Sequence, residues 1–186
     1  MSGPRDSGLL TLEPFIEAVQ DGVEDVGWEL SGLQKTTSHR FEGRWDGEST
    51  RSAYLFFHSD AGPDCVSIDV YLDETTQGLA GNIALVVDLV PLGELGDTAS
   101  ALRELSSLSA AALSTGRRRP VTLRLRLEDA ETPSDEAETE VRFKLRIPRG
   151  TIAEGPTSVR ALVREAVAAF EQILSSGRLS GFMQDE

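Results

Sequence analysis

The chain has very little of the side-chain chemistry on which most enzymes and metal proteins rely. Among its 186 residues there is one cysteine, Cys65, and there are only two histidines, His39 and His58. A single cysteine excludes a disulfide within the chain and favours a reducing, cytoplasmic location. So few thiol and imidazole groups leave carboxylates as almost the only candidates for a nucleophile or a general base. We therefore expect a protein that is not an enzyme.

Sequence motifs for catalysis or cofactor binding are also missing. Neither a Gly-rich phosphate-binding loop nor a G-x-S-x-G nucleophile motif occurs. His58, Asp60 and Asp64 lie close in sequence, but an ordinary turn explains them better than a metal site does. Cys65 has no basic neighbour in sequence to activate it, and a small buried side chain is the simplest interpretation. We predict no catalytic residue, no cofactor and no metal.

Long hydrophobic runs and excess positive charge are absent as well. No apolar run approaches the roughly 18 residues that a membrane span needs, and the first ten residues are too polar for a signal peptide. The chain has 18 Lys and Arg against 31 Asp and Glu, a net charge of −13. This acidity disfavours binding to nucleic acid or anionic lipid, and it suits a basic partner or simple solubility. We expect neither nucleic acid nor a membrane as partner.

The clearest structural pattern is an amphipathic helix over Thr157 to Leu174. Its apolar residues recur at the i, i+3, i+4, i+7 spacing of one helix face: Val159, Leu162, Val163, Ala166, Val167, Phe170, Ile173 and Leu174. Two further helices are predicted over Leu12 to Val23 and Asp97 to Ser114. A helix with such a stripe needs a receiving surface, because most helical stability in proteins comes from packing.

Strands fill the rest of the chain. Alternating or apolar patterns predict them at the following places: Trp28–Leu33, His39–Trp45, Ser52–Ser59, Cys65–Leu72, Asn82–Val90, Val121–Leu127 and Val141–Ile147. In Ser52–Ser59 the apolar residues Tyr54 to Phe57 occupy both faces, which suggests a strand covered on both sides. Short turns between neighbouring strands favour an antiparallel sheet over βαβ units.

These elements predict one α+β domain. A single antiparallel sheet would carry three helices, with the long C-terminal helix packed on it. We expect a flexible tail at residues 1–10, the domain at 11–176, and a polar tail at 177–186 that holds Leu179 and Phe182.

The distribution of basic residues is the most unusual feature of the sequence. Five of them alternate with apolar residues on the last two predicted strands: Arg124, Arg126, Arg142, Lys144 and Arg146. If these strands pair as a hairpin, the five side chains form a basic patch opposite the apolar face. The loop Glu128 to Glu140 between them carries seven acids. The patch is either a solvated face that discourages aggregation or a docking face for an acidic segment, from a partner or from this loop. Nucleic acid is a weaker third option, because no aromatic residues are interleaved with the cations.

The order of elements resembles that of the type III secretion chaperones and the related YbjN-like domains. Those have a helix, three strands, a helix, two strands and a final helix. Here Leu12–Val23, the strands within Ser52–Val90, Asp97–Ser114, the last two strands and Val159–Leu174 follow that order, with Trp28–Leu33 and His39–Trp45 in addition. The resemblance implies a non-enzymatic chaperone or adaptor, often a homodimer, that holds an extended partner segment along exposed apolar grooves.

Three functions are compatible with these observations. The first is a cytoplasmic, chaperone-like or adaptor-like domain that binds a protein partner or self-associates. The second is a helix-grip, START-like binder of a small apolar ligand, which needs a cavity beside Val163, Val167 and Phe170. The third is an acidic immunity-type or inhibitor-type protein that neutralises a basic toxin.

Overall fold

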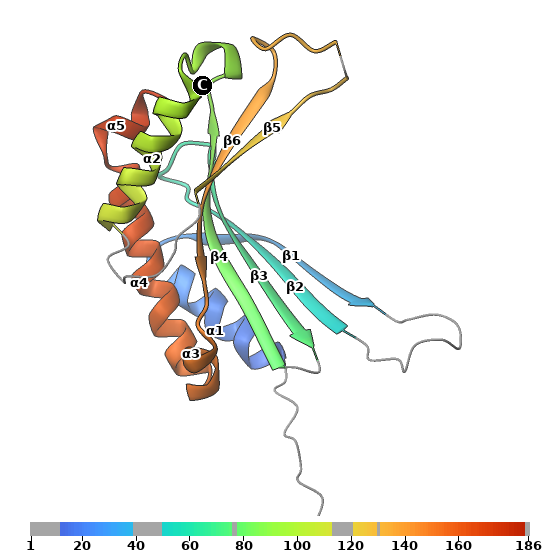
Figure 1. The fold of residues 1–186 in the computed structure, drawn as a ribbon. Coiled ribbons are helices and arrows are strands. Elements are labelled where there is room, and N and C mark those ends of the chain that lie inside the picture. The colour runs from blue at the N-terminus through green and yellow to red at the C-terminus, as the bar shows by residue number, and fades with distance from the viewer. Residues whose placement is uncertain (1–11, 39–49, 76–77, 113–120, 130, 185–186) are drawn as a thin grey trace, which may run out of the picture.

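The computed structural model describes residues 12–38, 50–75, 78–112, 121–129 and 131–184. Within these ranges the chain forms one six-stranded antiparallel sheet and several helices (Figure 1). The strands are β1 (Glu29–Ser38), β2 (Thr50–His58), β3 (Val66–Thr75), β4 (Gly78–Leu89), β5 (Val121–Arg126) and β6 (Glu138–Arg146). The helices are α1 (Leu12–Glu24), η1 (Leu92–Glu94), α2 (Thr98–Ala112), α3 (Arg149–Glu154), α4 (Pro156–Leu174) and α5 (Gly177–Ser180). The predicted α+β class and single antiparallel sheet are confirmed.

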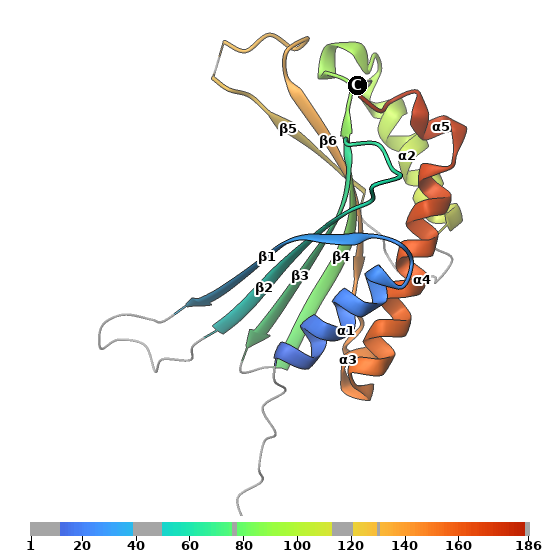
Figure 2. The same cartoon turned by 180° about the vertical axis from the view of Figure 1, so that it is seen from behind.

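The strand order in the sheet is β1-β2-β3-β4-β6-β5. Strands β1 to β4 follow one another as antiparallel neighbours, whereas the chain leaves the sheet after β4 to form α2. It then returns as a hairpin in which β6 pairs with β4 and β5 lies at the edge. The sheet is strongly twisted, so that β1 to β3 and the β5–β6 hairpin diverge from each other (Figures 1 and 2).

The helices lie on one side of the sheet (Figures 1 and 2). Because side chains alternate along a strand, every second residue points toward them. The residues that do so on β2, β3, β4 and β6 are almost all apolar and buried: Ala53, Leu55, Phe57, Val66, Ile68, Val70, Leu72, Ile83, Leu85, Val87, Val141 and Phe143. The opposite face of the sheet has no helix over it in the part of the chain that the structure describes.

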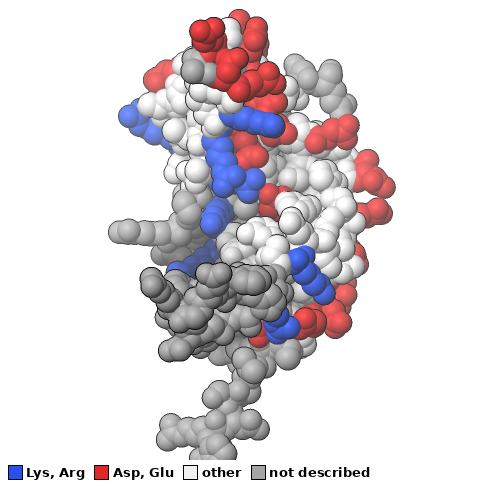
Figure 3. Space-filling view, turned by 90° about the vertical axis from the view of Figure 1, so that its right-hand side faces the viewer, with Lys and Arg blue, Asp and Glu red and all other residues white. Residues whose placement is uncertain are grey.

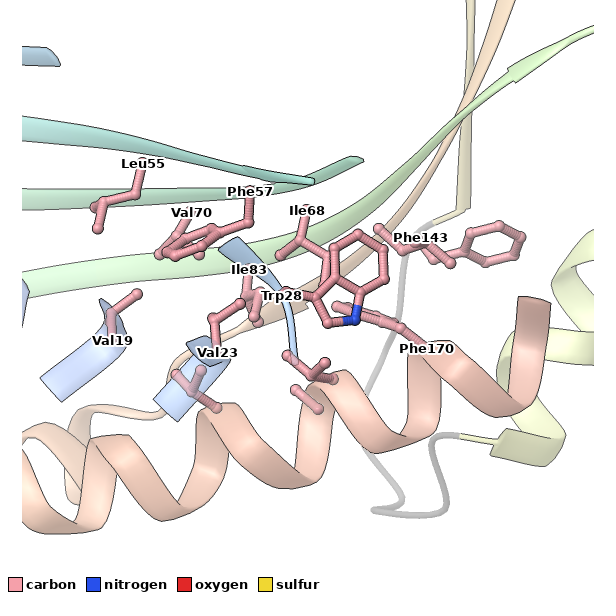
Figure 4. Close-up of a cluster of buried hydrophobic side chains, with 14 of the residues drawn as sticks. Val19, Val23, Trp28, Leu55, Phe57, Ile68, Val70, Ile83, Phe143 and Phe170 are labelled. Atoms are coloured by element: carbon pink, nitrogen blue, oxygen red, sulfur yellow. The ribbon is translucent and has the colours of Figure 1, made fainter. Parts of the chain in front are cut away.

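Helix α4 contributes a long apolar stripe to the cover. Its predicted apolar stripe is confirmed, since Val159, Val163, Ala166, Val167, Phe170 and Ile173 are all buried. Phe170 points into the space between helix and sheet, close to Trp28 and Phe143 (Figure 4). The indole N–H of Trp28 donates a hydrogen bond to Glu171 Oε1 at 3.4 Å. The stripe and the strands therefore share a filled core.

Helices α1 and α4 approach each other closely at Gly22. A β-carbon at this position would lie 2.9 Å from the Arg160 carbonyl oxygen, so a larger residue would force the helices apart. Arg160 also joins the two helices through its guanidinium, which forms ion pairs with Asp21 at 3.1 Å and Asp25 at 2.8 Å. These contacts fix α1 and α4 as one layer on the sheet.

Several boundaries differ from the prediction. Strand β1 continues past Leu33 to Ser38, and β6 begins at Glu138 instead of Val141, so the last three residues of the predicted acidic loop, Glu138 to Glu140, belong to the sheet. The segment that we expected to be a polar C-terminal tail contains α5, with Leu179 buried, and Met183 forms a bridge with Leu89. The predicted strand His39–Trp45 lies outside the described residues. None of the helices in the described ranges combines the length and the apolar character that crossing a membrane requires.

Candidate functional site: the open face of the sheet

The candidate site is the sheet face that is turned away from the helices, which we call the open face. Strands β2, β3, β4, β5 and β6 build it from every second side chain. Its central part is lined by polar, aromatic and basic residues: Tyr54, Phe56, Asp69, Tyr71, Asn82, Ala84, Thr122, Arg124, Arg142, Lys144 and Arg146. The expectation that Tyr54 to Phe57 indicate a strand covered on both sides is therefore wrong. Leu55 and Phe57 are buried, but Tyr54 is 38% exposed.

The open face is hollowed along β6. One hollow is lined by Arg124, Glu138 and Glu140, a second by Arg124, Tyr71 and Lys144, and a third by Tyr71, Lys144 and Arg146. The second and third hollows share Tyr71, Asn82 and Lys144, and the first meets the second at Arg124. We call the three hollows together the open-face groove. It follows β6 over eight residue steps, or roughly 27 Å at about 3.4 Å per residue. Its shape suits an extended chain better than a compact ligand.

The five basic residues predicted as a partner-binding patch all lie on this face. The β5–β6 register places Arg124 opposite Glu140, Arg126 opposite Glu138, and Arg142 opposite Thr122. Lys144 and Arg146 continue the row opposite Ala84 and Asn82 on β4. In Figure 3, Lys and Arg form a stripe down this side of the molecule, with acidic residues gathered at the end where the β5–β6 loop lies. The prediction that the two strands pair with their cations on one face is confirmed.

Two of these five cations are already engaged by carboxylates of the same face. Arg126 forms an ion pair with Glu138 at 3.1 Å. Arg142 pairs with Glu140 and with Asp69, the latter at 3.0 Å. Two acidic residues that we expected in the loop, Glu138 and Glu140, therefore lie at the start of β6 and neutralise part of the basic patch.

The other three cations are free of such partners. Arg124, Lys144 and Arg146 are exposed and make no ion pair with any residue in the described ranges. Lys144 and Arg146 lie at the end of the groove that is remote from Glu138 and Glu140. The sign of the charge therefore changes along β6, from acidic at its start to basic at its end.

An aromatic platform lies beside the stripe, and sequence reasoning missed it. Tyr54 and Tyr71 face each other across β2 and β3 with ring centroids 4.7 Å apart. Phe56 lies two residues further along β2 on the same face. The signal was present in the alternation of Tyr54 and Phe56 with the buried Leu55 and Phe57. What the sequence could not show is that Tyr71 of the next strand joins them, because this depends on register.

Asp69 is a mostly buried carboxyl group of the open face, with a side chain that is 19% exposed. It lies opposite Phe56 and Ala84 in the two neighbouring strands. Burial raises the pKa of Asp69, although Arg142 and a hydrogen bond from Ser67 act in the opposite direction. The pKa of Asp88 is raised too, by burial and by the nearby negative charges of Glu140 and Glu138.

This raised pKa predicts how replacing Asp69 affects stability at different pH values. The folded protein binds the Asp69 proton more tightly than the unfolded chain does. The resulting stability is complete below the ordinary carboxyl pKa of 3.8 and is lost as the pH rises through the raised value. The Asp69→Asn variant escapes this loss, so its stability relative to the wild type should rise from about pH 3 to about pH 7.

Urea unfolding of both proteins across this pH range measures the effect. The exposed Asp60→Asn variant controls for the amide itself. An advantage of Asp69→Asn that shrinks as the pH rises would show that Arg142 outweighs burial at this site.

The described residues offer no metal centre, because no group of three or more His, Cys, Asp or Glu side chains among them is placed to hold an ion. His58 Nδ1 lies 2.8 Å from Ser31 Oγ, and this contact joins β1 to β2. Comparison with known proteins adds no assignment, since no family model, no curated protein and no solved structure matches this chain.

Proposed function

We propose that this chain is a non-enzymatic protein-binding domain, chaperone-like or adaptor-like, that holds an extended segment of a partner protein along the open-face groove. The observation that carries the proposal is the groove itself. It runs for most of the length of β6 on a face that no described helix covers, and it combines aromatic rings with exposed cations that have no described ion partner. Extended segments bind such surfaces through side chains placed at every second residue.

The same face also indicates the chemistry of the segment. Lys144 and Arg146 favour acidic side chains at their end of the groove, and the Tyr54–Tyr71 pair favours an aromatic or proline side chain beside it. Asp69, Asp73 and Asp88 on the same face disfavour a nucleic acid, whose phosphates carry one charge per nucleotide. We therefore favour a protein segment as the occupant.

The helix-grip alternative receives less support. It requires an apolar cavity beside Val163, Val167 and Phe170, and these three residues are 0% exposed. None of them lines the three hollows of the open face or the fourth hollow, which lies beside Asp25 and Arg164.

The element order supports a relationship to the type III secretion chaperones and YbjN-like domains, which we keep as part of the proposal. A helix, strands, a helix, two strands and a closing helix occur in that order, with one more strand before α2 than the family pattern has. A cytoplasmic location and a homodimer, both expected of such a chaperone, belong to the same proposal.

Selection from a displayed library of linear peptides tests this function without a known partner. The wild-type chain is the bait, and an unrelated acidic protein of similar size is the control bait. We expect enrichment of sequences that combine acidic residues with an aromatic residue or proline. Failure to enrich any sequence over the control would refute the proposal. Enrichment of basic sequences would favour the toxin-neutralising alternative instead.

A further inference from the structure

The outer edge of β5 is a second surface with an unusual composition. β5 is the last strand of the sheet and pairs with β6 on one side only. No described strand pairs with its other side, where backbone N–H and C=O groups are available to an added strand. The β5–β6 hairpin diverges from α2 and α4 toward the end where its loop lies (Figures 1 and 2), and η1 contacts that end through the N–H groups of Leu92 and Gly93, which donate to the Ala137 and Ser134 carbonyls.

Apolar side chains at this edge are poorly covered. Leu125 is 48% exposed and Leu127, which directly follows the strand, is 49% exposed. Leu125 lies on the helix side of the sheet, because it pairs with the buried Thr139 of β6. Isolated exposed leucines are common on protein surfaces, but here two successive apolar positions of an edge strand are half uncovered.

Cations occupy the other face of the same strand. The Arg126 side chain is 80% exposed and its ion pair with Glu138 is on the surface. Arg124 lies opposite Glu140, but that carboxylate pairs with Arg142. The edge strand therefore presents leucines on one face and incompletely neutralised arginines on the other.

Strand β6 shows which chemistry complements β5. Across the hairpin, Glu138 lies opposite Arg126 and Thr139 opposite Leu125. The next two pairs repeat the pattern with Glu140 opposite Arg124 and Val141 opposite Leu123. A strand that matches β5 thus alternates acidic side chains with uncharged ones that cover the leucines.

From this arrangement we infer that the outer edge of β5 accepts an added strand from a partner protein, with acidic and apolar residues in alternation. The apolar residues would cover Leu125 and Leu127, and the acidic residues would meet Arg124 and Arg126. A second copy of the chain is a poorer occupant, because pairing two β5 strands brings four arginines to one seam. This edge borders the open-face groove, which Arg124 to Arg126 also line, but the inference uses the unpaired outer side of β5 and does not depend on the proposed function.

Two synthetic peptides test the inference on the full chain. The first alternates glutamate with valine, and the second has lysine in place of every glutamate; both are capped at their ends. We expect the glutamate peptide to bind about tenfold or more tightly than the lysine peptide in fluorescence anisotropy at low salt. Hydrogen exchange of the β5 amides should slow when the glutamate peptide is added, because an added strand bonds to them.

A variant pair locates the binding. Leu125→Asn with Leu127→Asn removes the apolar surface without adding charge and should weaken binding of the glutamate peptide by about tenfold or more. Leu33→Asn, at a 42% exposed leucine of the opposite edge strand β1, is the control and should leave binding unchanged.

Three results would overturn the inference, and the first two need no variant. They are equal or absent binding of the two peptides, an unchanged exchange rate at β5, and an equal loss in the Leu33→Asn control. Light scattering on the wild type adds a further check, since a dimer that the Leu125→Asn, Leu127→Asn variant dissociates would identify the second copy as the occupant instead.

Discussion

Replacing Phe170 with alanine is expected to cost about 3–5 kcal/mol of unfolding free energy, the usual range for a fully buried phenylalanine. Phe170 is 0% exposed and lies between α4 and the sheet, close to Trp28 and Phe143 (Figure 4). The truncation removes apolar contacts and leaves a cavity that packed neighbours only partly fill. Since a domain of this kind is stable by only about 5–15 kcal/mol, the variant would lose a large part of its total stability.

Phe56→Ala is the matched control for this experiment. Phe56 carries the same side chain but lies half-buried on the open face, so its loss should cost on the order of 1 kcal/mol. Urea unfolding of both variants and the wild type gives the two values. Equal losses would contradict the assignment of the helix side as the single core and the open face as a free surface.

Reversing the two free cations at the basic end of the groove is expected to have the largest effect on binding. For a peptide enriched by the selection described above, Lys144→Glu with Arg146→Glu should weaken affinity about 100-fold, or roughly 2.7 kcal/mol. Attraction of acidic side chains then becomes repulsion on an exposed face. Stability should change by no more than about 0.5 kcal/mol, because neither residue has a described ion partner to lose.

A control variant must separate the effect of the protein's net charge from the effect of where the charges lie. Arg103→Glu with Arg149→Glu changes the charge by the same amount at exposed residues of α2 and α3, away from the open face. Isothermal titration calorimetry compares both double variants with the wild type at one salt concentration. If the control loses as much affinity as the open-face variant, the net charge and not the groove governs binding.

Elements with a strong periodic pattern were predictable from sequence. The α4 stripe, the alternation of β3, and the facing of the basic residues on β5 and β6 follow from residue spacing alone, because they are local properties. The predicted helix Thr157–Leu174 and the observed α4, Pro156–Leu174, differ by one residue. The fold class followed from the order of these elements and the short connections between them.

Features that depend on pairing between strands were not predictable. Strand β1 continues through polar residues past Leu33, and an irregularity between Leu30 and Gly32 interrupts its alternation. Glu138 and Glu140 look like loop residues because their neutralising partners, Arg126 and Arg142, become apparent only when the strands are paired. Local sequence carries no information about such partners.

The candidate site, too, was only partly predictable from the sequence. Its cations were identified from alternation on two strands. Its aromatic platform was not, since Tyr54 and Tyr71 come from different strands and meet only in the observed register. The carboxylates that engage Arg126 and Arg142 were expected to lie in a loop, so the division of the patch into engaged and free cations also required the structure.

The most direct test of the central claim is to map where an enriched peptide contacts the protein, by NMR shift changes of the isotope-labelled chain. The open-face account predicts that the largest changes fall on residues that line the groove, such as Tyr54, Tyr71, Ala84 and Lys144. Changes centred instead on the hollow beside Asp25 and Arg164, on the outer surface of α4, would contradict it.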